Sequence, residues 1–332
     1  MKTYPVWLMV LALAVMISYT AESRCFGNDE KTDLRADLQD DRLLIFCGSQ
    51  LVAEYVYRDP HILRPYFSNV HTPSGIRVTR NHPPIEGQDQ MDHATMHPGI
   101  WIGFGNVNGE DFWRNKGKIQ HEKFLSNPVI MDGSLEFATT STLIGNSDSK
   151  IGTMNCRFHI SKLKSGIRFI WIVDFPVKAS KQNGSEPTIT FGDQEEMGFG
   201  IRVATPLTEK NGGRIRSSKG VETAKSTWGQ SADWCDYSGK MDDREVGITV
   251  LCEFTKERPT WWHNRDYGLM VANAFGRAAM KQGPVQSTIV EPGRSLVLKY
   301  GIVIHEGSEY SPSQEYKAFS ENLQSLRLFE NP

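Results

Sequence analysis

Short segments typical of β-strands follow one another through most of this sequence, with turn residues between most of them. One segment has convincing helical periodicity: over residues 313–326, Tyr316, Phe319, Leu323 and Leu326 share a face. The expected strands cover residues 43–47, 51–57, 66–70, 135–144, 153–163, 167–177, 188–191, 198–204, 246–254, 268–273 and 295–305. Many strands with short turns and a single late helix predict an all-β fold, a large antiparallel β-sandwich with one C-terminal helix.

The size and charge of the chain further limit the classes of protein to which it can belong. It has 332 residues, 39% of them hydrophobic, which is ample for a large core. The formal net charge of −2 gives no basic footprint for nucleic acid, so we expect no nucleic-acid partner. We expect one sandwich domain over residues 43–330, preceded by a polar linker over residues 24–42.

The N-terminus has the layout of a secretory signal peptide. Lys2 precedes a mostly apolar run over residues 6–17, and Ala21 and Ser23 stand at positions −3 and −1 of a cleavage site. The run is short for a membrane span, although an uncleaved anchor is the alternative. We expect removal of residues 1–23 and a secreted or periplasmic protein without a membrane span.

Five cysteines remain after such a cleavage: Cys25, Cys47, Cys156, Cys235 and Cys252. They are widely scattered and form no CxxC pair, so a redox or zinc-thiolate role is not expected. An exported chain can form one or two disulfides from this set, but the spacing alone assigns none.

The first concentration of chemically active residues is the stretch 92–114, which contains His93, His97 and Trp101. A strand is expected from residue 100, with Ile100, Ile102 and Phe104 on the core side and Trp101, Gly103 and Gly105 on the other. An indole beside two glycines leaves room for a molecule to lie against the strand. Pro98 and Gly99 argue against a helix, so the two histidines are expected in a loop rather than as the i, i+4 pair of a helical zinc site.

A second concentration lies on the expected strand at 198–204. Phe199, Ile201 and Val203 alternate toward the core, which places Glu196, Gly198, Gly200 and Arg202 on the opposite face. A carboxylate and a guanidinium separated by glycines indicate a groove with a polar group at each end. The alternative is a bulged edge strand whose charges are merely solvated.

A third concentration is the segment 258–268, expected to be a loop that enters the strand 268–273. It combines aromatic, imidazole and carboxylate groups, a mixture typical of sugar sites. Its candidate residues are Trp262, His263, Arg265, Asp266 and Tyr267. Some of these aromatic side chains are expected to be core residues instead.

These patterns favour an imidazole–carboxylate acid–base site, because an imidazole donates or accepts a proton near neutral pH. The sequence has no GxSxG, HExxH or P-loop motif, which removes the common serine hydrolase, zincin and nucleotide-binding interpretations. The candidate catalytic residues are His93, His97, Glu196, His263 and Asp266. The candidate substrate-binding residues are Trp101, Asn106, Asp111, Arg202, Trp262, Arg265 and Tyr267. No cofactor and no metal are assigned, and His121 or Glu122 is a further candidate for the site.

The motifs together resemble those of the bacterial PmoA-like family, an exported domain of unknown function that is labelled methane oxygenase. The resemblance rests on residues 92–113, 64–75, 195–202, 265–268 and 272–276, and it spans roughly Leu43 to His305. Asn106 departs from the pattern, because relatives often carry aspartate there. The methane-oxygenase label does not suit a chain without an apolar run of spanning length after its signal. The family is similar instead to galactose-mutarotase-like β-supersandwich proteins, which implies a sugar on a concave sheet.

The leading hypothesis is therefore an exported carbohydrate-active protein, an epimerase, lyase or glycosidase, whose partner is a carbohydrate or another small-molecule substrate. The first alternative is a non-catalytic carbohydrate-binding protein that uses the same groove. The second is an enzyme with a mononuclear metal site made by His93, His97 and a carboxylate. The sequence leaves open the sugar, the bond, the presence of catalysis, the disulfide pairing and the oligomeric state.

Overall fold

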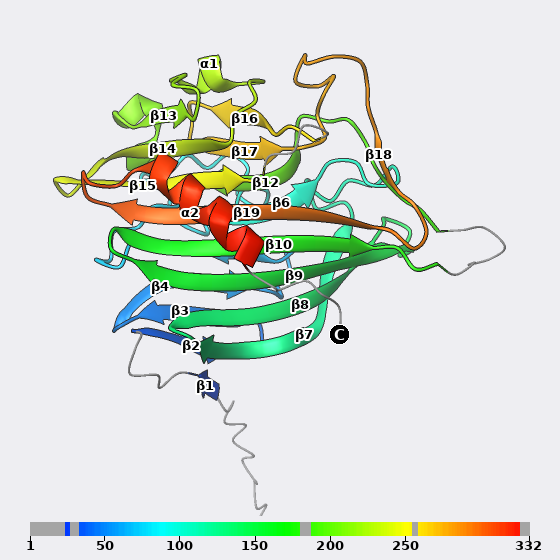
Figure 1. The fold of residues 1–332 in the computed structure, drawn as a ribbon, viewed down its shortest axis with the longest axis horizontal. Coiled ribbons are helices and arrows are strands. Elements are labelled where there is room, and N and C mark those ends of the chain that lie inside the picture. The colour runs from blue at the N-terminus through cyan, green and yellow to red at the C-terminus, as the bar shows by residue number, and fades with distance from the viewer. Residues whose placement is uncertain (1–23, 27–32, 180–186, 254–257, 326–332) are drawn as a thin grey trace, which may run out of the picture.

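The structure is a computed structural model, and it describes residues 24–26, 33–179, 187–253 and 258–325. Two antiparallel sheets pack face to face (Figure 1). In spatial order the nine-stranded sheet contains β1 (Arg24–Phe26), β2 (Leu34–Leu38), β3 (Arg42–Cys47), β4 (Gln50–Val56), β5 (Tyr66–Ser68), β6 (Ile100–Phe104), β12 (Met197–Arg202), β17 (Leu269–Asn273) and β16 (Trp261–Arg265). The expected signal peptide, residues 1–23, lies outside the described residues.

The second sheet has eight strands and carries the long helix. In spatial order it contains β13 (Arg214–Ser217), β14 (Trp234–Met241), β15 (Arg244–Cys252), β19 (Ser295–Glu306), β10 (Gly166–Pro176), β9 (Lys150–Leu163), β8 (Ser134–Ile144) and β7 (Lys118–Met131). The remaining elements are the strand pair β11 (Ile189–Phe191) and β18 (Thr288–Val290), the 3₁₀ turns η1 (Thr205–Leu207) and η2 (Glu209–Asn211), and the helices α1 (Ala224–Thr227) and α2 (Pro312–Ser325). Within the described residues, no helix combines the length and apolar character that a membrane span requires.

Aromatic side chains from both sheets form the core between them. Trp171 on β10 contacts Phe67 on β5 and Phe199 on β12, each with ring centroids 5.5 Å apart. These residues are at most 2% exposed, and burial of each large apolar side chain contributes about 1.5–3 kcal/mol. On the far side of the eight-stranded sheet, Phe319 of α2 packs in a separate cluster with Ile170.

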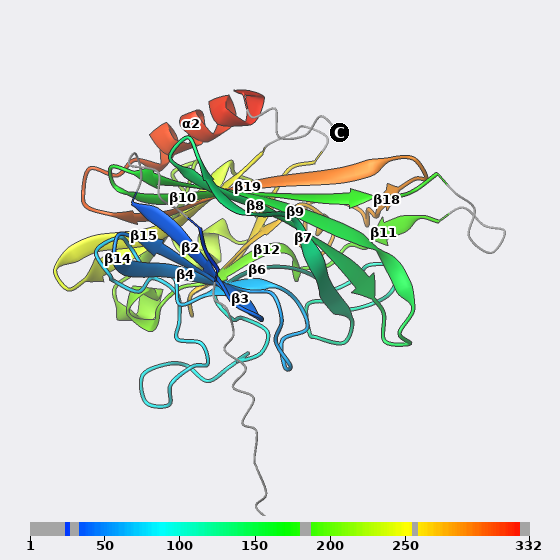
Figure 2. The same cartoon turned by 90° about the horizontal axis from the view of Figure 1, so that it is seen from below.

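The predicted all-β antiparallel sandwich with one C-terminal helix is confirmed. The expected strands at 43–47 and 51–57 form the hairpin β3–β4, and the helix expected over 313–326 is α2. Figure 2 shows α2 on one side of the sandwich and the loops between β5 and β7 on the other. Those loops cover the outer face of the nine-stranded sheet, which is the face that carries the candidate residues.

Two expectations about the chain's organisation require correction. The segment 24–42 is not merely a polar linker, because Leu34–Leu38 forms β2 and pairs with β3. Leu34 and Ala36 are buried, while the Arg35 guanidinium lies over the ring of Phe46, 3.7 Å from its centroid. The segment 261–265, expected in a loop, forms the edge strand β16, because it pairs with β17 and is buried on both faces.

The expectation of one or two disulfides is not met among the cysteines whose side chains the structure describes. Cys47, Cys156, Cys235 and Cys252 are all free and buried. Burial raises the pKa of the Cys156 thiol to about 12, so this thiol remains protonated at neutral pH.

Gly166→Ala is expected to destabilise the sandwich strongly. Gly166 has φ +150°, and a Cβ placed there would lie 1.9 Å from the carbonyl oxygen of Ile304 on the paired strand β19. Gly48 in the β3–β4 turn is the matched control, because it also has positive φ, +61°, but no atom lies within 4 Å of its added Cβ. We expect a loss of about 1 kcal/mol for Gly48→Ala and at least about 3 kcal/mol for Gly166→Ala in urea unfolding. Equal losses would mean that backbone strain alone, without the steric contact, sets the requirement for glycine.

Candidate functional site

Candidate residues from three separate segments lie on the outer face of the nine-stranded sheet. His263 on β16 pairs with Val271 on β17, Val271 with Gly200 on β12, and Gly200 with Trp101 on β6. Arg265 and Arg202 flank Leu269 in the neighbouring row. Three segments remote in sequence are thus placed side by side by strand pairing.

The predicted alternation on β6 is confirmed, but the space beside it is already filled. Ile100, Ile102 and Phe104 belong to the core between the sheets, whereas Trp101 belongs to a separate cluster on the outer face. The Trp101 indole lies over Gly200, where an added Cβ would be 2.6 Å from the ring. Trp101 is 0% exposed. At the two glycines beside it on β6, an added Cβ would lie 3.3 Å from the Trp113 ring at Gly103 and 2.5 Å from the Gln194 side chain at Gly105. The space that the sequence left for a ligand is therefore filled by side chains of the protein.

Three rings form a column that rises from this indole to the surface. His97 stacks on Trp101 with centroids 5.1 Å apart, and His93 stacks on His97 at 4.7 Å. His97 is 2% exposed, while the His93 side chain is 37% exposed. Only the outermost imidazole of the column is therefore accessible to a ligand.

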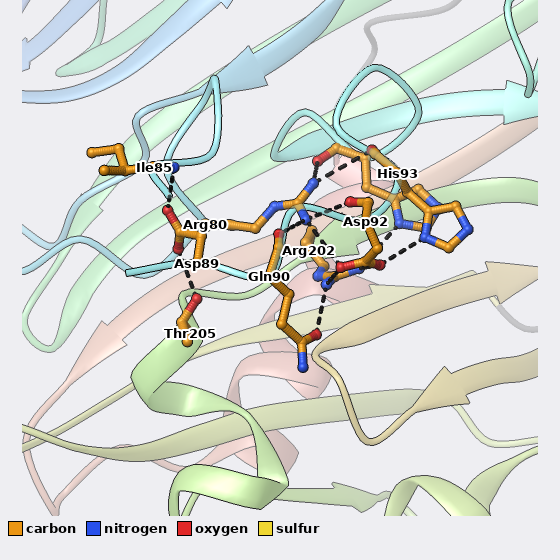
Figure 3. A network of polar contacts seen from close by, with 9 residues as sticks. Arg80, Ile85, Asp89, Gln90, Asp92, His93, Arg202 and Thr205 are labelled. Carbon is orange, nitrogen blue, oxygen red and sulfur yellow. Dashed lines mark hydrogen bonds and ion pairs between the residues drawn. The ribbon is translucent and has the colours of Figure 1, made fainter. Parts of the chain in front are cut away.

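Arg80 holds the loop that carries both histidines (Figure 3). Its guanidinium donates to the carbonyl oxygens of Gln90 at 2.8 Å, Asp92 at 2.7 Å, His93 at 3.4 Å and His97 at 3.2 Å. Burial lowers the pKa of Arg80 to about 10, which still leaves it charged at neutral pH. The expected loop position of the two histidines is confirmed, and one buried cation fixes the shape of that loop.

Arg202 joins this loop to the sheet through Asp92. Its two terminal nitrogens donate to the two oxygens of Asp92 at 2.9 and 2.8 Å, and Nη1 lies 3.3 Å from Nδ1 of His97. Burial by itself raises the pKa of Asp92, but hydrogen bonds from Arg202 and His93 outweigh it and hold that pKa well below its usual range. Burial and the nearby arginines lower the pKa of His97 well below its usual value, so His97 is neutral and accepts from Arg202.

A second cluster surrounds Glu195, at the other side of the same face. One of its carboxylate oxygens lies 2.7 Å from Nδ1 of His263, 2.7 Å from Nε1 of Trp228 and 2.6 Å from Nη2 of Arg265. The contact with His263 is the largest cause that lowers the pKa of Glu195 to about 2. Burial lowers the pKa of His263, against the attraction of Glu195.

Tyr267 lies between the two clusters. The guanidinium of Arg202 is 4.4 Å from its ring centroid, and the His93 ring stacks beside it at 6.2 Å. Burial raises the pKa of Tyr267, and this pKa also responds to Arg265 and Glu195 from the second cluster. Arg265, whose guanidinium contacts Glu195, precedes Tyr267 by two residues, so the second cluster adjoins this phenol through the β16–β17 turn.

Three candidate residues have other roles in the structure. Glu196 forms an ion pair with Arg114, which also binds Asp111 at 3.0 Å. Asp111 accepts from the backbone amides of residues 113 and 114, so it holds a turn. Asn106 does the same for the amide of Gly109 at 3.0 Å.

Two further candidates do not reach the site. The Asp266 side chain is exposed in the β16–β17 turn, and its carbonyl oxygen accepts from Tyr237 at 3.2 Å. Trp262 is 0% exposed in the core and donates to the carbonyl of Ala232. Because β16 is a strand, its alternation sends Trp262 inward and His263 outward. The further candidate His121 lies on β7, at the edge of the other sheet, where its ring packs against Tyr57 with the centroids 4.6 Å apart.

Sequence reasoning missed several members of the site. Asp92 and Glu195 each stand next to a residue that was selected, and the chain bends at 195–196 before β12 begins. Adjacency to His93 was an available signal for Asp92. Arg80 carries no local signal, because it binds backbone carbonyl oxygens 10 to 17 residues further along the chain. Trp228 belongs to the aromatic residues that add to the sugar-site inventory, although its contact with Glu195 was not predicted.

Comparison with known proteins identifies the family. Residues 42–318 match the profile of DUF6807, described as a family of unknown function. That description contains no methane oxygenase, so the PmoA-like label suggested by the motifs is not supported. No curated protein matches this sequence.

Solved structures of similar fold include two galactose mutarotase-like proteins. The one from Clostridium acetobutylicum is 8% identical, with 86% of this chain and 98% of that chain covered and a TM-score of 0.34. The one from Lactobacillus casei is 9% identical, with coverages of 85% and 100% and a TM-score of 0.36. The Slr1438 protein from Synechocystis is 13% identical, with coverages of 87% and 98% and a TM-score of 0.35. Likeness at these scores carries no argument about function.

His97→Gln is expected to remove part of the pH dependence of stability. The pKa of His97 in the folded chain lies well below the value of about 6.5 typical of an unfolded chain. As pH falls below about 6.5, the unfolded state binds the proton first, so wild-type stability decreases by up to about 1.4 kcal/mol per pH unit. Between pH 7.5 and 5.5, urea unfolding should show wild type losing about 1.4 kcal/mol more than the variant. Parallel pH profiles would mean that folding does not lower the pKa of His97.

Zinc is not expected to stabilise the protein, although Asp92, His93 and His97 offer ligand atoms within 4.8 Å of one another. Both oxygens of Asp92 already accept from Arg202, which would stand beside the ion. Two like unit charges about 4 Å apart repel by about 4 kcal/mol at an effective dielectric constant of 20. We expect a zinc titration of the metal-free protein to leave its Tm unchanged. A rise in Tm that His97→Gln abolishes would establish the metal site instead.

Proposed function

The chain belongs to the DUF6807 family of unknown function, and we propose that it is an exported carbohydrate-active protein whose acid–base site lies beside Tyr267. One observation carries this proposal: two histidine–carboxylate pairs lie on this face, Asp92–His93 beside the ring of Tyr267 and Glu195–His263 against Arg265, which precedes Tyr267 by two residues. Export rests on the signal-like segment 1–23.

His93 is the proposed acid–base residue. Asp92 contacts Nδ1 of His93 at 2.7 Å, which leaves Nε2 as the atom that exchanges a proton with a bound saccharide. The negative charge of Asp92 stabilises the imidazolium that forms, and Arg202 keeps Asp92 ionised and fixed in place. The 37% exposure of the His93 side chain gives a ligand access to this ring.

Glu195 is the proposed partner on the other side of Tyr267. Its pKa of about 2 makes it a permanent acceptor at neutral pH, suited to binding hydroxyl groups rather than to donating a proton. Its side chain is 35% exposed, and contacts from His263, Trp228 and Arg265 fix its orientation. A sugar placed across Tyr267 would have a base on one side and a fixed anion on the other.

This arrangement suits several reaction classes that share one step, a proton transfer. Epimerisation, elimination and glycoside hydrolysis all require a proton to move at the substrate, and His93 supplies the site for it. A non-catalytic sugar-binding protein would need the oriented acceptors but not the proton transfer. A variant that loses turnover but keeps saccharide binding would identify the protein as an enzyme rather than a sugar-binding protein.

His93→Gln is expected to lower turnover by about a hundredfold or more while saccharide binding remains. The assay incubates purified protein with a panel of polysaccharides and 3-keto sugars, and it detects products by mass spectrometry and binding by calorimetry. His159→Gln is the matched control, because His159 also contacts a carboxylate, Glu136 at 3.0 Å, but on the other sheet. Binding without any turnover in wild type would favour the sugar-binding alternative. Equal turnover by wild type and His93→Gln would remove His93 from the mechanism.

A further inference from the structure

A polar cavity of about 620 Å³ lies where β16 begins, at Trp261. Its volume falls within the range of about 300–1,000 Å³ that is usual for small-molecule sites. The side chains that distinguish it are Arg258, Arg277, Trp261, Gln282 and Gln286. The other lining residues are Ser231, Pro259, Ala274, Phe275, Ser287 and Thr288, so among the residues that the structure describes two cations and no carboxylate line this space.

The nearby acidic side chain of Asp193 is engaged elsewhere. Its carboxylate accepts from the backbone amides of Ala278 at 2.8 Å, Ala279 at 3.0 Å and Gln286 at 3.0 Å. Asp193 therefore ties the two ends of the 277–286 loop together through these hydrogen bonds. Arg277 lies on that loop and donates to Gln286 at 3.2 Å, which orients its planar guanidinium.

The cavity adjoins the proposed reaction site through β16 and Trp228. Trp261 lies two residues from His263 on the same face of the strand, which corresponds to about 6.8 Å. Trp228 donates to Glu195 at 2.7 Å, while Nζ of Lys281, from the cavity's loop, lies 5.6 Å from its ring. An oligosaccharide of several rings could reach from Tyr267 along β16 into the cavity, because the strand from Trp261 to Arg265 is itself about 14 Å long.

We propose that this cavity is a subsite for the anionic group of a charged saccharide, a carboxylate or a sulfate ester. The inference rests on the proposed function in taking a saccharide as the ligand, and it adds the charge of that saccharide and the place where it binds. Planar guanidinium groups bind carboxylate and sulfate oxygens through paired, charge-assisted hydrogen bonds. Trp261 offers an indole edge against the ring, and the glutamine amides provide donors for neighbouring hydroxyl groups.

The test begins with an array of hexuronate, sulfated and neutral oligosaccharides. The wild-type protein should bind an anionic member of the array at least tenfold more tightly than a matched neutral one. For a hexuronate, the matched ligand is the same oligosaccharide after reduction of its carboxyl groups to alcohols; for a sulfated one, it is the desulfated form. The comparison between the hexuronate and sulfated arms identifies which anion the cavity accepts.

Calorimetry on the tightest anionic ligand then locates the subsite. Arg277→Gln should weaken binding by about ten- to hundredfold, Arg277→Lys should weaken it less, and binding of the matched neutral ligand should not change. Arg244→Gln is the control, because Arg244 is a 59% exposed side chain on β15 of the other sheet. Where turnover is measurable, Arg277→Gln should raise KM and leave kcat unchanged. Circular dichroism and Tm establish that each variant is folded, and Gln282→Ala provides a second, milder change in the same cavity.

Three results would overturn the inference. Equal binding of anionic and neutral ligands, or of neutral ligands alone, removes the anionic subsite and leaves the proposed function standing. Tight binding of an anionic saccharide that Arg277→Gln and Gln282→Ala do not weaken places the anion elsewhere. Failure to bind any saccharide removes the proposed function together with the subsite.

Discussion

The site depends on two buried arginines that fasten one loop to the outer face of the nine-stranded sheet. Arg80 and Arg202 are 2% and 1% exposed, and an unpaired charge at such depth would cost several kcal/mol. Arg80 is compensated by carbonyl oxygens of the 90–97 loop, and Arg202 by the Asp92 carboxylate. Because the loop supplies these acceptors only in one conformation, the need to satisfy the arginines determines the positions of His93 and His97.

The same requirement divides the outer face into a packed part and an accessible part. Trp101 fills the space above Gly200 on β12, His97 stacks on Trp101, and His93 stacks on His97. Toward β16, the side chains of Glu195 and Arg265 remain about one-third exposed. The buried rings of His97 and Trp101 hold His93 in a fixed orientation. The charged groups beside them remain exposed, so a ligand can reach them.

The pattern of residues along the chain was sufficient to predict the fold class and the side of the strand on which many side chains lie. Strict alternation placed Ile100, Ile102 and Phe104 in the core and Trp101 opposite them, because a strand's two faces alternate whatever its neighbours are. Helical periodicity identified α2 for the same local reason. The edge strand β16 was not predicted. It is a strand because it pairs with β17 and is buried on both faces, and its own residue pattern does not indicate this.

By itself the sequence determined that this chain is an antiparallel β-sandwich with histidines, aromatic residues and arginines concentrated in three segments. Tertiary structure alone decided which of these residues meet. The pair Arg202–Asp92 joins positions 110 residues apart, and no local pattern encodes such a contact. A bend at 195–196 assigns Glu195 to His263 and Glu196 to Arg114, although the two glutamates are indistinguishable in the sequence. The groove expected above Gly200 is occupied by Trp101, because the neighbouring strand β6 presents an indole at that register.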